Sequence, residues 1–390
     1  RFVESDEEGN ETLLGADVRI GESWELADMG IVDSVLSNGW LAGNTISELM
    51  ETYMERIVGE NVHNFYGRQF PVLIKFLNVN DRLSVQVHPD DEIAAERYDF
   101  LGKAEIWYVM DVKPGAKIYM GFNRDMTAQE FYDRCNNGTV EEVLNVISPR
   151  KGDVIYIKPG ILIAEIQESS DMTFRLYDWG RELDPSTARP MHLEEAIDVI
   201  DYKAFDPGLY RKGPFWGDEA SSVPCKSCDC EDDCHCHDEH HHSSEGKVVE
   251  TLVELPQFNV TKLNLKDSLH IYTDQFESYI VYMCIDGAAS VQVPSTNENG
   301  EAFMDNYEFS KGETILIPAD MEDFYLVPRD IETVLLEVVT RPAEYVDDYI
   351  DPETEAFLEG EDYEGLEDGV FDDDDEPVGP TGASPLNFFS

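Results

Sequence analysis

The sequence predicts a mainly β protein made of two copies of a similar β domain. Short runs rich in Val, Ile, Tyr and Phe recur through residues 71–178 and 249–345, and Gly, Pro and Asp separate them. Short strands with regular turns are typical of barrels and sandwiches. A Lys-Gly-acid turn followed by an apolar strand also occurs twice, at residues 151–158 and 311–318. Such an internal repeat favours two copies of one fold.

Composition restricts the partners that the protein can have. The chain has 390 residues, 42% of them apolar, which is enough for two or three domains with a sizeable core. The 28 basic and 82 acidic residues give a formal net charge of −54. This charge repels nucleic acid and anionic membranes, so we expect neither as a partner. The first residue is Arg1 rather than Met, which predicts a trimmed N-terminus.

Cysteine usage indicates a reducing compartment. Five of the seven cysteines lie between residues 225 and 236, while Cys135 and Cys284 stand alone in apolar surroundings. We expect these two to be buried thiols. The distribution does not suit a disulfide framework and predicts a cytoplasmic protein.

Residues 1–202 form the predicted first domain, and its helices follow from capping patterns. Thr45 and Glu48 form a capping box, and apolar residues at helical spacing continue to Ile57. Two further capping boxes start at Thr127 and Thr139 and predict a small helical insertion at about residues 125–147.

The domain is then expected to close with a helix over residues 193–202. Residues 203–248 form a predicted linker, rich in Cys and His from Cys225 to His242. This composition can bind extra soft metal ions. The spacing does not match one tetrahedral module, so adventitious or storage-like binding, no role and a structural site all stay open.

The second domain is predicted at residues 249–345 and is expected to be non-catalytic. It lacks a Gln-x-His pair, and its His270 stands alone, which favours a structural role. Residues 346–390 form an acidic tail, and like-charge blocks of this kind stay extended and disordered.

The residues that can carry chemistry concentrate between positions 71 and 107. Gln86 and His88 are two apart on a predicted strand, so their side chains point to the same face. Glu105 lies on a second predicted strand, which can bring its carboxylate to them. An amide oxygen, an imidazole and a carboxylate supply three of the four positions of a zinc-type site.

Four segments together resemble a known family. Residues 86–91 read Gln-Val-His-Pro-Asp-Asp, and residues 103–105 read Lys-Ala-Glu. Gly-Glu-Ser-Trp stands at residues 21–24, and residues 163–178 include Arg175. In these segments the chain closely resembles the type I mannose-6-phosphate isomerases, a cupin family. The resemblance is strong over about residues 17–200, weak over the second domain, and absent from the linker and the tail.

The resemblance implies two cupin-like jelly-roll barrels and a zinc-dependent enzyme that interconverts mannose 6-phosphate and fructose 6-phosphate. Its partner would be a small sugar phosphate, with one Zn²⁺ in the catalytic domain. Gln86, His88 and Glu105 match the family's metal ligands, and Arg175 and Lys103 match its catalytic positions. A metal ion suits an aldose–ketose isomerase because it polarises the sugar oxygens while a proton moves between C1 and C2.

One departure from the family pattern concerns the fourth ligand, a His that should follow a Pro-Gly turn. The expected segment falls in a gap between Ile157 and Ile161, and the next His after His88 is His192. Three explanations stay open: a missing segment, an inactive copy, or Glu165 or Gln167 as the ligand. The alternative function is therefore a non-catalytic cupin that binds a sugar phosphate or a metal.

Overall fold

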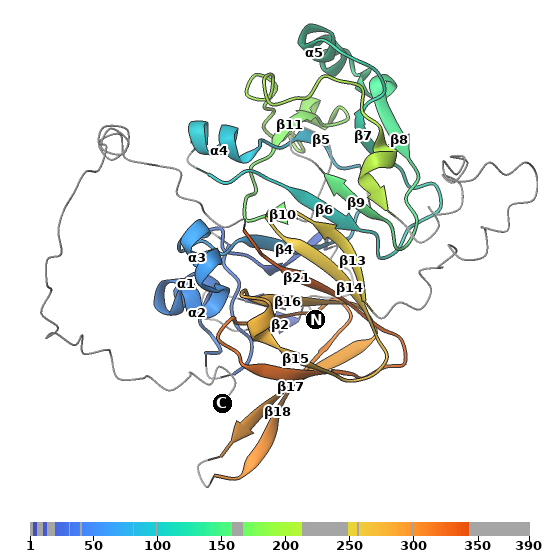
Figure 1. The fold of residues 1–390 in the computed structure, drawn as a ribbon. Helices are drawn as coiled ribbons and strands as arrows, with labels where there is room; N and C mark the ends of the chain where they lie inside the picture. The colour runs from blue at the N-terminus through green and yellow to red at the C-terminus, as the bar shows by residue number, and fades with distance from the viewer. Residues whose placement is uncertain are drawn as a thin grey trace, which may run out of the picture.

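The structure is a computed structural model that describes residues 3–5, 11–13, 20–30, 32–39, 41–80, 82–98, 100–157, 167–212, 249–255, 257–297 and 300–342. Strands dominate these residues, which confirms the prediction of a mainly β protein. The strands form two lobes that lie one above the other in Figure 1. Within the described ranges, no helix has both the length and the apolar character needed to cross a membrane.

The first lobe is built on a six-stranded sheet with the order β12-β9-β6-β10-β4-β3. Its strands are β3 (Glu22–Leu26), β4 (Val72–Leu77), β6 (Glu105–Tyr108), β9 (Val154–Ile157), β10 (Gln167–Glu168) and β12 (Arg211–Lys212). Three separate strand pairs accompany it: β1 (Val3–Ser5) with β2 (Glu11–Leu13), β5 (Val85–Val87) with β11 (Phe174–Tyr177), and β7 (Ile118–Phe122) with β8 (Leu144–Ile147).

The sheets formed by the described residues do not close into the barrels that the sequence analysis expected, although the protein is mainly β as predicted. In the first lobe, β5 and β11 pair only with each other rather than continuing the larger sheet. The strand β10 contributes just two residues between β6 and β4.

Capping residues explain where the helices begin. In α1 (Ile46–Tyr53) the predicted capping box is present, because the Glu48 amide donates to Thr45 and the Thr45 amide donates to the Glu48 carboxylate at 2.9 Å. The helix stops at Met54, whose φ is 47°, rather than continuing to Ile57 as predicted. The other helices are α2 (Glu55–Val58), α3 (Glu60–Tyr66), α4 (Asp91–Tyr98) and α5 (Ala128–Asn137).

Two predicted helices have different structures. Thr139 precedes only a short 3-10 helix, η1 (Val140–Val143), and its side chain makes no capping hydrogen bond. Residues 193–202 form turns rather than a helix, with the Val199 amide bonded to the Ala196 carbonyl at 3.0 Å. Ala196 and Val199 are buried in the core of the first lobe. Tertiary packing of these apolar side chains therefore overrides the helical spacing.

The second lobe is a sandwich of two antiparallel sheets. One sheet has the order β13-β14-β21-β16-β19 and the other β15-β20-β17-β18. The strands are β13 (Val249–Glu254), β14 (Asn259–Leu265), β15 (Leu269–Tyr272), β16 (Ile280–Asp286), β17 (Ala288–Thr296), β18 (Ala302–Ser310), β19 (Thr314–Ile317), β20 (Asp323–Pro328) and β21 (Thr333–Val339). The described 3-10 turns besides η1 are η2 (Arg181–Leu183) and η3 (Pro207–Tyr210) in the first lobe and η5 (Thr273–Gln275) in the second.

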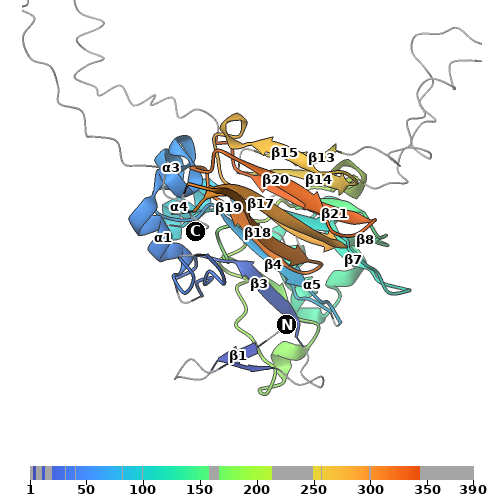
Figure 2. The same ribbon diagram turned by 90° about the horizontal axis from the view of Figure 1, so that it is seen from below.

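A shared apolar core joins the two lobes. Val72 and Ile106 of the six-stranded sheet pack in one cluster with Val281, Leu336 and Val338 of the second lobe. Helices α1 to α3 cover the same cluster and lie beside this junction in Figures 1 and 2. One face of the six-stranded sheet is thus used for packing between lobes, and the opposite face is left for the site.

Candidate active site

Alternation along β6 directs the chemical side chains away from the core between the lobes. Ala104 and Ile106 are buried in that core. Glu105 and Trp107 alternate with them in sequence, so their side chains point to the opposite face of the sheet. Lys103 is two residues before Glu105, and its side chain is fully buried beside it. The sequence-predicted Lys-x-Glu pair therefore occupies one face.

The short strand β5 positions the other predicted residues. Val85 and Val87 are buried in the core of the first lobe, which leaves Gln86 on the alternate face. Arg175 of β11 lies directly across from Gln86 in the antiparallel register. His88 follows the strand immediately, two residues after Gln86. The structure thus places Gln86 and Arg175 opposite each other on two paired strands, with His88 just past the end of one of them.

His88, Glu105 and Lys103 meet in the protein interior. The Nε2 atom of His88 lies 3.2 Å from Oε2 of Glu105, and Nζ of Lys103 lies 3.7 Å from the same oxygen. All three side chains are inaccessible to solvent. A buried cluster of this kind holds its geometry well. Each group has lost its contact with water, and a group that moved away would also lose the neighbours that compensate for this loss.

The backbone and Thr173 orient the His88 ring. Nδ1 of His88 lies 3.3 Å from the carbonyl oxygen of Met172 and 3.4 Å from Oγ1 of Thr173. Lys103 donates to the same hydroxyl at 3.4 Å. A proton on Nδ1 can be donated to the carbonyl, which leaves the lone pair of Nε2 directed at the Glu105 carboxylate. Histidine ligands of metals are commonly fixed in this way.

The Glu105 carboxylate has one oxygen without a hydrogen-bond partner among the described residues. Its Oε1 accepts from Nε1 of Trp107 at 3.1 Å, while Oε2 is buried with no hydrogen bond in that part of the chain. With the proton on Nδ1, the lone pair of His88 Nε2 and the carboxylate oxygen repel each other, and a cation between them would add to the compensation that the Lys103 ammonium gives from 3.7 Å. The imidazole and the carboxylate are therefore donors that fit a divalent ion such as zinc.

The carboxylate and histidine groups by themselves do not complete a metal cluster. In the part of the chain that the structure describes, no group of three His, Cys, Asp or Glu side chains gathers around one point. Glu165 and the gap after Ile157 lie outside the described residues, as does the Cys/His-rich stretch of the linker. The backbone of Gln167 pairs with that of Glu105 in the sheet.

A cavity of about 620 Å³ opens beside the cluster and is rich in cations. Gln86, Thr173 and Arg175 line it, and so do four further basic residues, namely Lys75, Arg82, Arg181 and Arg189. Two acids, Glu22 and Asp171, are also in the wall. In a protein of net charge −54 this excess of positive charge is a local exception. It favours an anionic ligand.

Arg175 is held in place within this cavity. Its Nε donates to Oγ of Ser84 at 3.3 Å and its Nη1 donates to the Pro190 carbonyl at 2.8 Å. Burial, followed by the neighbouring charge of Arg189, lowers the pKa of the Arg175 guanidinium from its ordinary value. The group stays charged at neutral pH because an arginine starts from a very high pKa.

Asp178 fixes two of the three other arginines of the cavity. Its buried carboxylate accepts from Arg181 at 2.7 Å and from Arg189 at 2.7 and 3.1 Å. Burial acts to raise the pKa of Asp178, but the hydrogen bonds from Arg189 and Arg181 outweigh it, so this pKa lies below its ordinary value. The sequence analysis did not single out this trio, although all three follow the Arg175 strand.

Lys75 is a further cavity residue that the sequence analysis missed. It is buried in β4, in an otherwise apolar run that reads as a plain strand. Its Nζ lies 3.4 Å from the Asp171 carboxylate and 4.1 Å from the centre of the Trp24 ring. A lysine is rarely buried without a partner or a function, and that rule is the signal that could have identified it.

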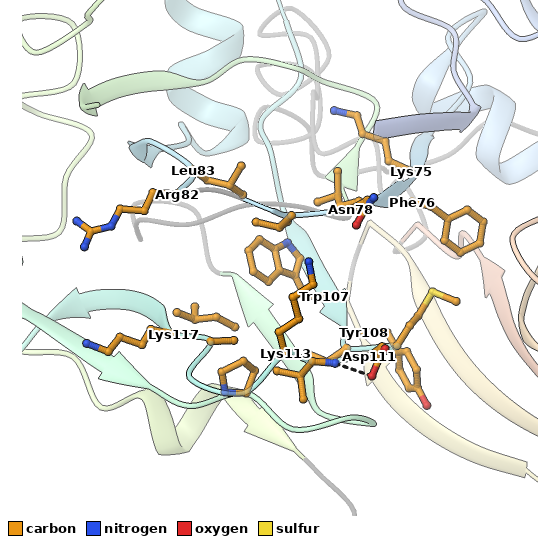
Figure 3. A pocket seen from close by; sticks show the side chains of 18 of the residues that line it. Lys75, Phe76, Asn78, Arg82, Leu83, Trp107, Tyr108, Asp111, Lys113 and Lys117 are labelled. Atoms are coloured by element: carbon orange, nitrogen blue, oxygen red, sulfur yellow. Dashed lines mark hydrogen bonds between the residues drawn. The ribbon is translucent and has the colours of Figure 1, made fainter. Parts of the chain in front are cut away.

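A second hollow of about 450 Å³ shares Lys75, Arg82 and Ser84 with the larger cavity; Figure 3 shows its lining. It is lined by Trp107 and by Met283 and Leu336 of the second lobe, with Lys113 on its wall. Trp107 thus lines this hollow and also donates a hydrogen bond to the Glu105 carboxylate.

The remaining predicted residues lie apart from the site. Cys135 and Cys284 are buried free thiols, as predicted, and burial raises their pKa to about 12 and about 11. His270 is in the second lobe, where its Nε2 lies 2.5 Å from Asp323 and its ring stacks on Tyr325. The linker cluster and the acidic tail lie outside the described residues.

A buried imidazole–carboxylate–lysine cluster beside an arginine-rich cavity, in a mainly β protein, is typical of an enzyme that acts on an anionic ligand. The family description "phosphomannose isomerase type I, catalytic domain" matches residues 6–134. Mannose-6-phosphate isomerase ManA of Bacillus subtilis is 31% identical, over 79% of this chain and 86% of its own. The Streptococcus mutans mannose-6-phosphate isomerase is 29% identical, over 76% and 82%.

Solved structures agree with these relatives. The mannose 6-phosphate isomerase of Bacillus subtilis superposes with a TM-score of 0.59 at 25% identity, covering 82% of this chain and 89% of its own. A structure from Archaeoglobus fulgidus, titled a putative mannosephosphate isomerase, has a TM-score of 0.58 at 15% identity, covering 82% and 88%, which supports the fold. The chain belongs to the mannose-6-phosphate isomerase family and is an isomerase.

Proposed function

We propose that the protein interconverts mannose 6-phosphate and fructose 6-phosphate at the cluster of His88, Glu105 and Lys103, with one zinc ion held by Gln86, His88 and Glu105. The observation that carries the proposal is Oε2 of Glu105, which has no hydrogen bond among the described residues and lies 3.2 Å from Nε2 of His88. A mannose 6-phosphate isomerase with a TM-score of 0.57 to this chain is titled as zinc-bound.

When bound, a zinc ion polarises the sugar oxygens and lowers the cost of moving a proton between C1 and C2. Gln86, His88 and Glu105 would be its protein ligands. Three protein ligands leave a position for water or substrate, as is usual in catalytic zinc sites. This arrangement supports activity without a histidine from the predicted gap. It also keeps open the replacement of that ligand by Glu165 or Gln167.

Lys103 is the residue best placed to handle a proton at a sugar oxygen. Its ammonium group lies 3.7 Å from Glu105 and donates at 3.4 Å to Thr173, which lines the larger cavity. In the proposed reaction, the C1 and C2 oxygens of the sugar would lie near this ammonium group. Arg175 would stabilise negative charge on the enediolate, because a guanidinium keeps its charge and offers several donors.

The phosphate would lie toward the basic end of the larger cavity. Lys75, Arg181 and Arg189 line this cavity together with Arg175. Arginine recognises a phosphate through two parallel hydrogen bonds, and Asp178 already holds two of these side chains in fixed positions. The open-chain sugar would then extend from this end toward Gln86 and the metal ligands.

A coupled isomerase assay with zinc restored after chelation tests the proposal. We expect turnover in the wild type and a loss of at least about 100-fold in a Gln86→Ala/His88→Ala double variant, because two ligands are removed. The double variant should also bind one zinc ion fewer than the wild type. His270→Ala is the matched control, since it removes a histidine from the second lobe, and it should keep both turnover and stoichiometry.

Two results would overturn parts of this proposal. Absence of turnover in metal-loaded protein of full length would remove the enzymatic function and leave a protein that binds sugar phosphate or metal without catalysis. An unchanged zinc stoichiometry in the double variant would instead show that zinc is bound elsewhere, for example by the cluster from Cys225 to His242.

A further inference from the structure

The indole of Trp107 makes the one hydrogen bond that the Glu105 carboxylate receives among the described residues. Nε1 of Trp107 donates to Oε1 of Glu105 at 3.1 Å. The two residues are two apart on β6, so they share a face of the sheet. The other carboxylate oxygen has no hydrogen bond in the same part of the chain and faces Nε2 of His88.

This hydrogen bond holds the carboxylate from one side, while the Lys103 ammonium lies 3.7 Å from the other oxygen. A carboxylate can rotate about its last side-chain bond, and that torsion is soft in the absence of a partner. Once Oε1 is held by Trp107, Oε2 is directed to one place, between His88 and Lys103. A ligand that is already oriented loses less conformational freedom when a metal binds.

The Trp107 ring is itself held by its surroundings. It packs against an apolar cluster that includes Ile118 and Met120 of β7 and Ile155 of β9. Its other neighbours form the wall of the 450 Å³ hollow between the lobes, where Figure 3 shows the ring standing between Lys113 and Leu83. The ring therefore has a fixed support from which to orient the carboxylate.

We propose that Trp107 is a positioning residue, which orients Glu105 for the metal from the side of the hollow between the lobes. The inference rests on the proposed function, because it takes Glu105 as a metal ligand. Groups that orient metal ligands typically contribute a factor of about 10 to 100 to metal affinity. Trp107 does not touch the substrate in this arrangement, and its effect passes through the carboxylate.

Trp107→Phe is the direct test, because phenylalanine keeps an aromatic ring but lacks the N–H. We expect the zinc dissociation constant of the first-lobe site to rise about 10- to 100-fold. That site is the one lost in the Gln86→Ala/His88→Ala variant. Trp24→Phe is a matched control for zinc affinity, since Nε1 of Trp24 donates at 3.0 Å to Glu22, also two residues away on one strand. This control should keep the zinc affinity of the wild type.

A second variant pair separates positioning from general packing. In a Glu105→Asp background the carboxylate is about one carbon too short to reach the indole, so adding Trp107→Phe should cause no further loss of zinc affinity. Equal losses from Trp107→Phe in the wild-type and Glu105→Asp backgrounds would mean that Trp107 acts through packing, and would overturn the inference. Unchanged zinc affinity in Trp107→Phe would do the same.

These outcomes are distinct from failure of the proposed function. If the wild type lacks the zinc site altogether, the proposed metal centre fails and the positioning role of Trp107 fails with it. If the wild type has that site and Trp107→Phe binds zinc equally well, only the positioning role fails. Thermal unfolding of the metal-free proteins adds a readout that does not depend on catalysis, because a packing role lowers metal-free stability and a positioning role chiefly lowers affinity.

Discussion

At the scale of single residues, charge is arranged in two different ways around the site. Glu105 keeps one oxygen without a hydrogen bond among the described residues, which is costly in the interior and fits a place where a cation binds. Asp178, by contrast, has both oxygens bonded to arginines. The first arrangement is prepared for a ligand, and the second holds positive side chains where a ligand can meet them.

Arg175→Lys tests whether geometry or charge matters at the cavity wall. Lysine keeps the positive charge but cannot reproduce the bonds to both Ser84 and Pro190 that orient the guanidinium. We expect kcat to fall by about 100-fold, the scale seen when one transition-state donor is removed. Zinc stoichiometry should not change. Steady-state kinetics with zinc in excess measure the effect, and a kcat equal to that of the wild type would exclude a role for the guanidinium.

Asp178→Asn should destabilise the protein in a pH-dependent way. The pKa of Asp178 is lowered in the folded protein, so its charged form stabilises the fold above its ordinary pKa of about 3.8 and this stabilisation is lost as the pH falls further. The variant should therefore unfold more easily than the wild type at pH 7. The difference should shrink below about pH 3.8. Urea unfolding at several pH values measures it, and a difference that does not depend on pH would contradict this role of the charge.

At the scale of elements, the repeated Lys-Gly-acid turn has the same backbone pattern in both lobes. The Gly152 amide donates to the Val109 carbonyl at 2.8 Å, and the Gly312 amide donates to the Cys284 carbonyl at 2.9 Å. Both glycines have positive φ, 88° and 85°. The sequence repeat therefore corresponds to one type of turn that occurs twice. In the first lobe it leads into β9, which pairs with β6, and in the second lobe it leads into β19, which pairs with β16.

Two glycines of the second lobe differ in what limits their substitution. Gly312 has a positive φ but open space around it, so Gly312→Ala should cost only about 1–2 kcal/mol of backbone strain. Gly287 also has a positive φ, and a Cβ there would lie 2.4 Å from the backbone oxygen of Glu332. Gly287→Ala should cost clearly more. Thermal unfolding compares the pair, and equal costs would show that the contact with Glu332 relaxes freely.

Sequence reasoning succeeded where a local rule decides the structure. The capping box at Thr45 follows from local hydrogen bonding, and the approach of His88 to Glu105 follows from strand alternation; both are present. It failed where long-range packing decides, as for residues 193–202, whose apolar side chains are buried in turns. Lys75 was missed because a partner 96 residues away, Asp171, makes its burial possible.

At the scale of the whole molecule, the two lobes share a core and so are expected to unfold together. The cluster that joins them contains Ile106 of the first lobe and Leu336 of the second, both at most 1% exposed. An ion pair between Arg56 and Asp320 spans the same boundary. A lobe that opened alone would expose this shared apolar surface to water, at a cost that rises with its area.

Leu336→Ala tests this coupling from the second lobe. Truncating a buried leucine typically costs about 2–5 kcal/mol, and here the cavity would form at the boundary between the lobes. We expect one cooperative transition at lower temperature, with the coupled loss of tryptophan signal from the first lobe, where Trp24, Trp107 and Trp179 lie. Ile331→Ala is the control, because that side chain is 95% exposed and should change stability by less than about 0.5 kcal/mol. Two separate transitions, with the tryptophan signal unaffected by Leu336→Ala, would show that the lobes fold independently and that contact between them does not support the site.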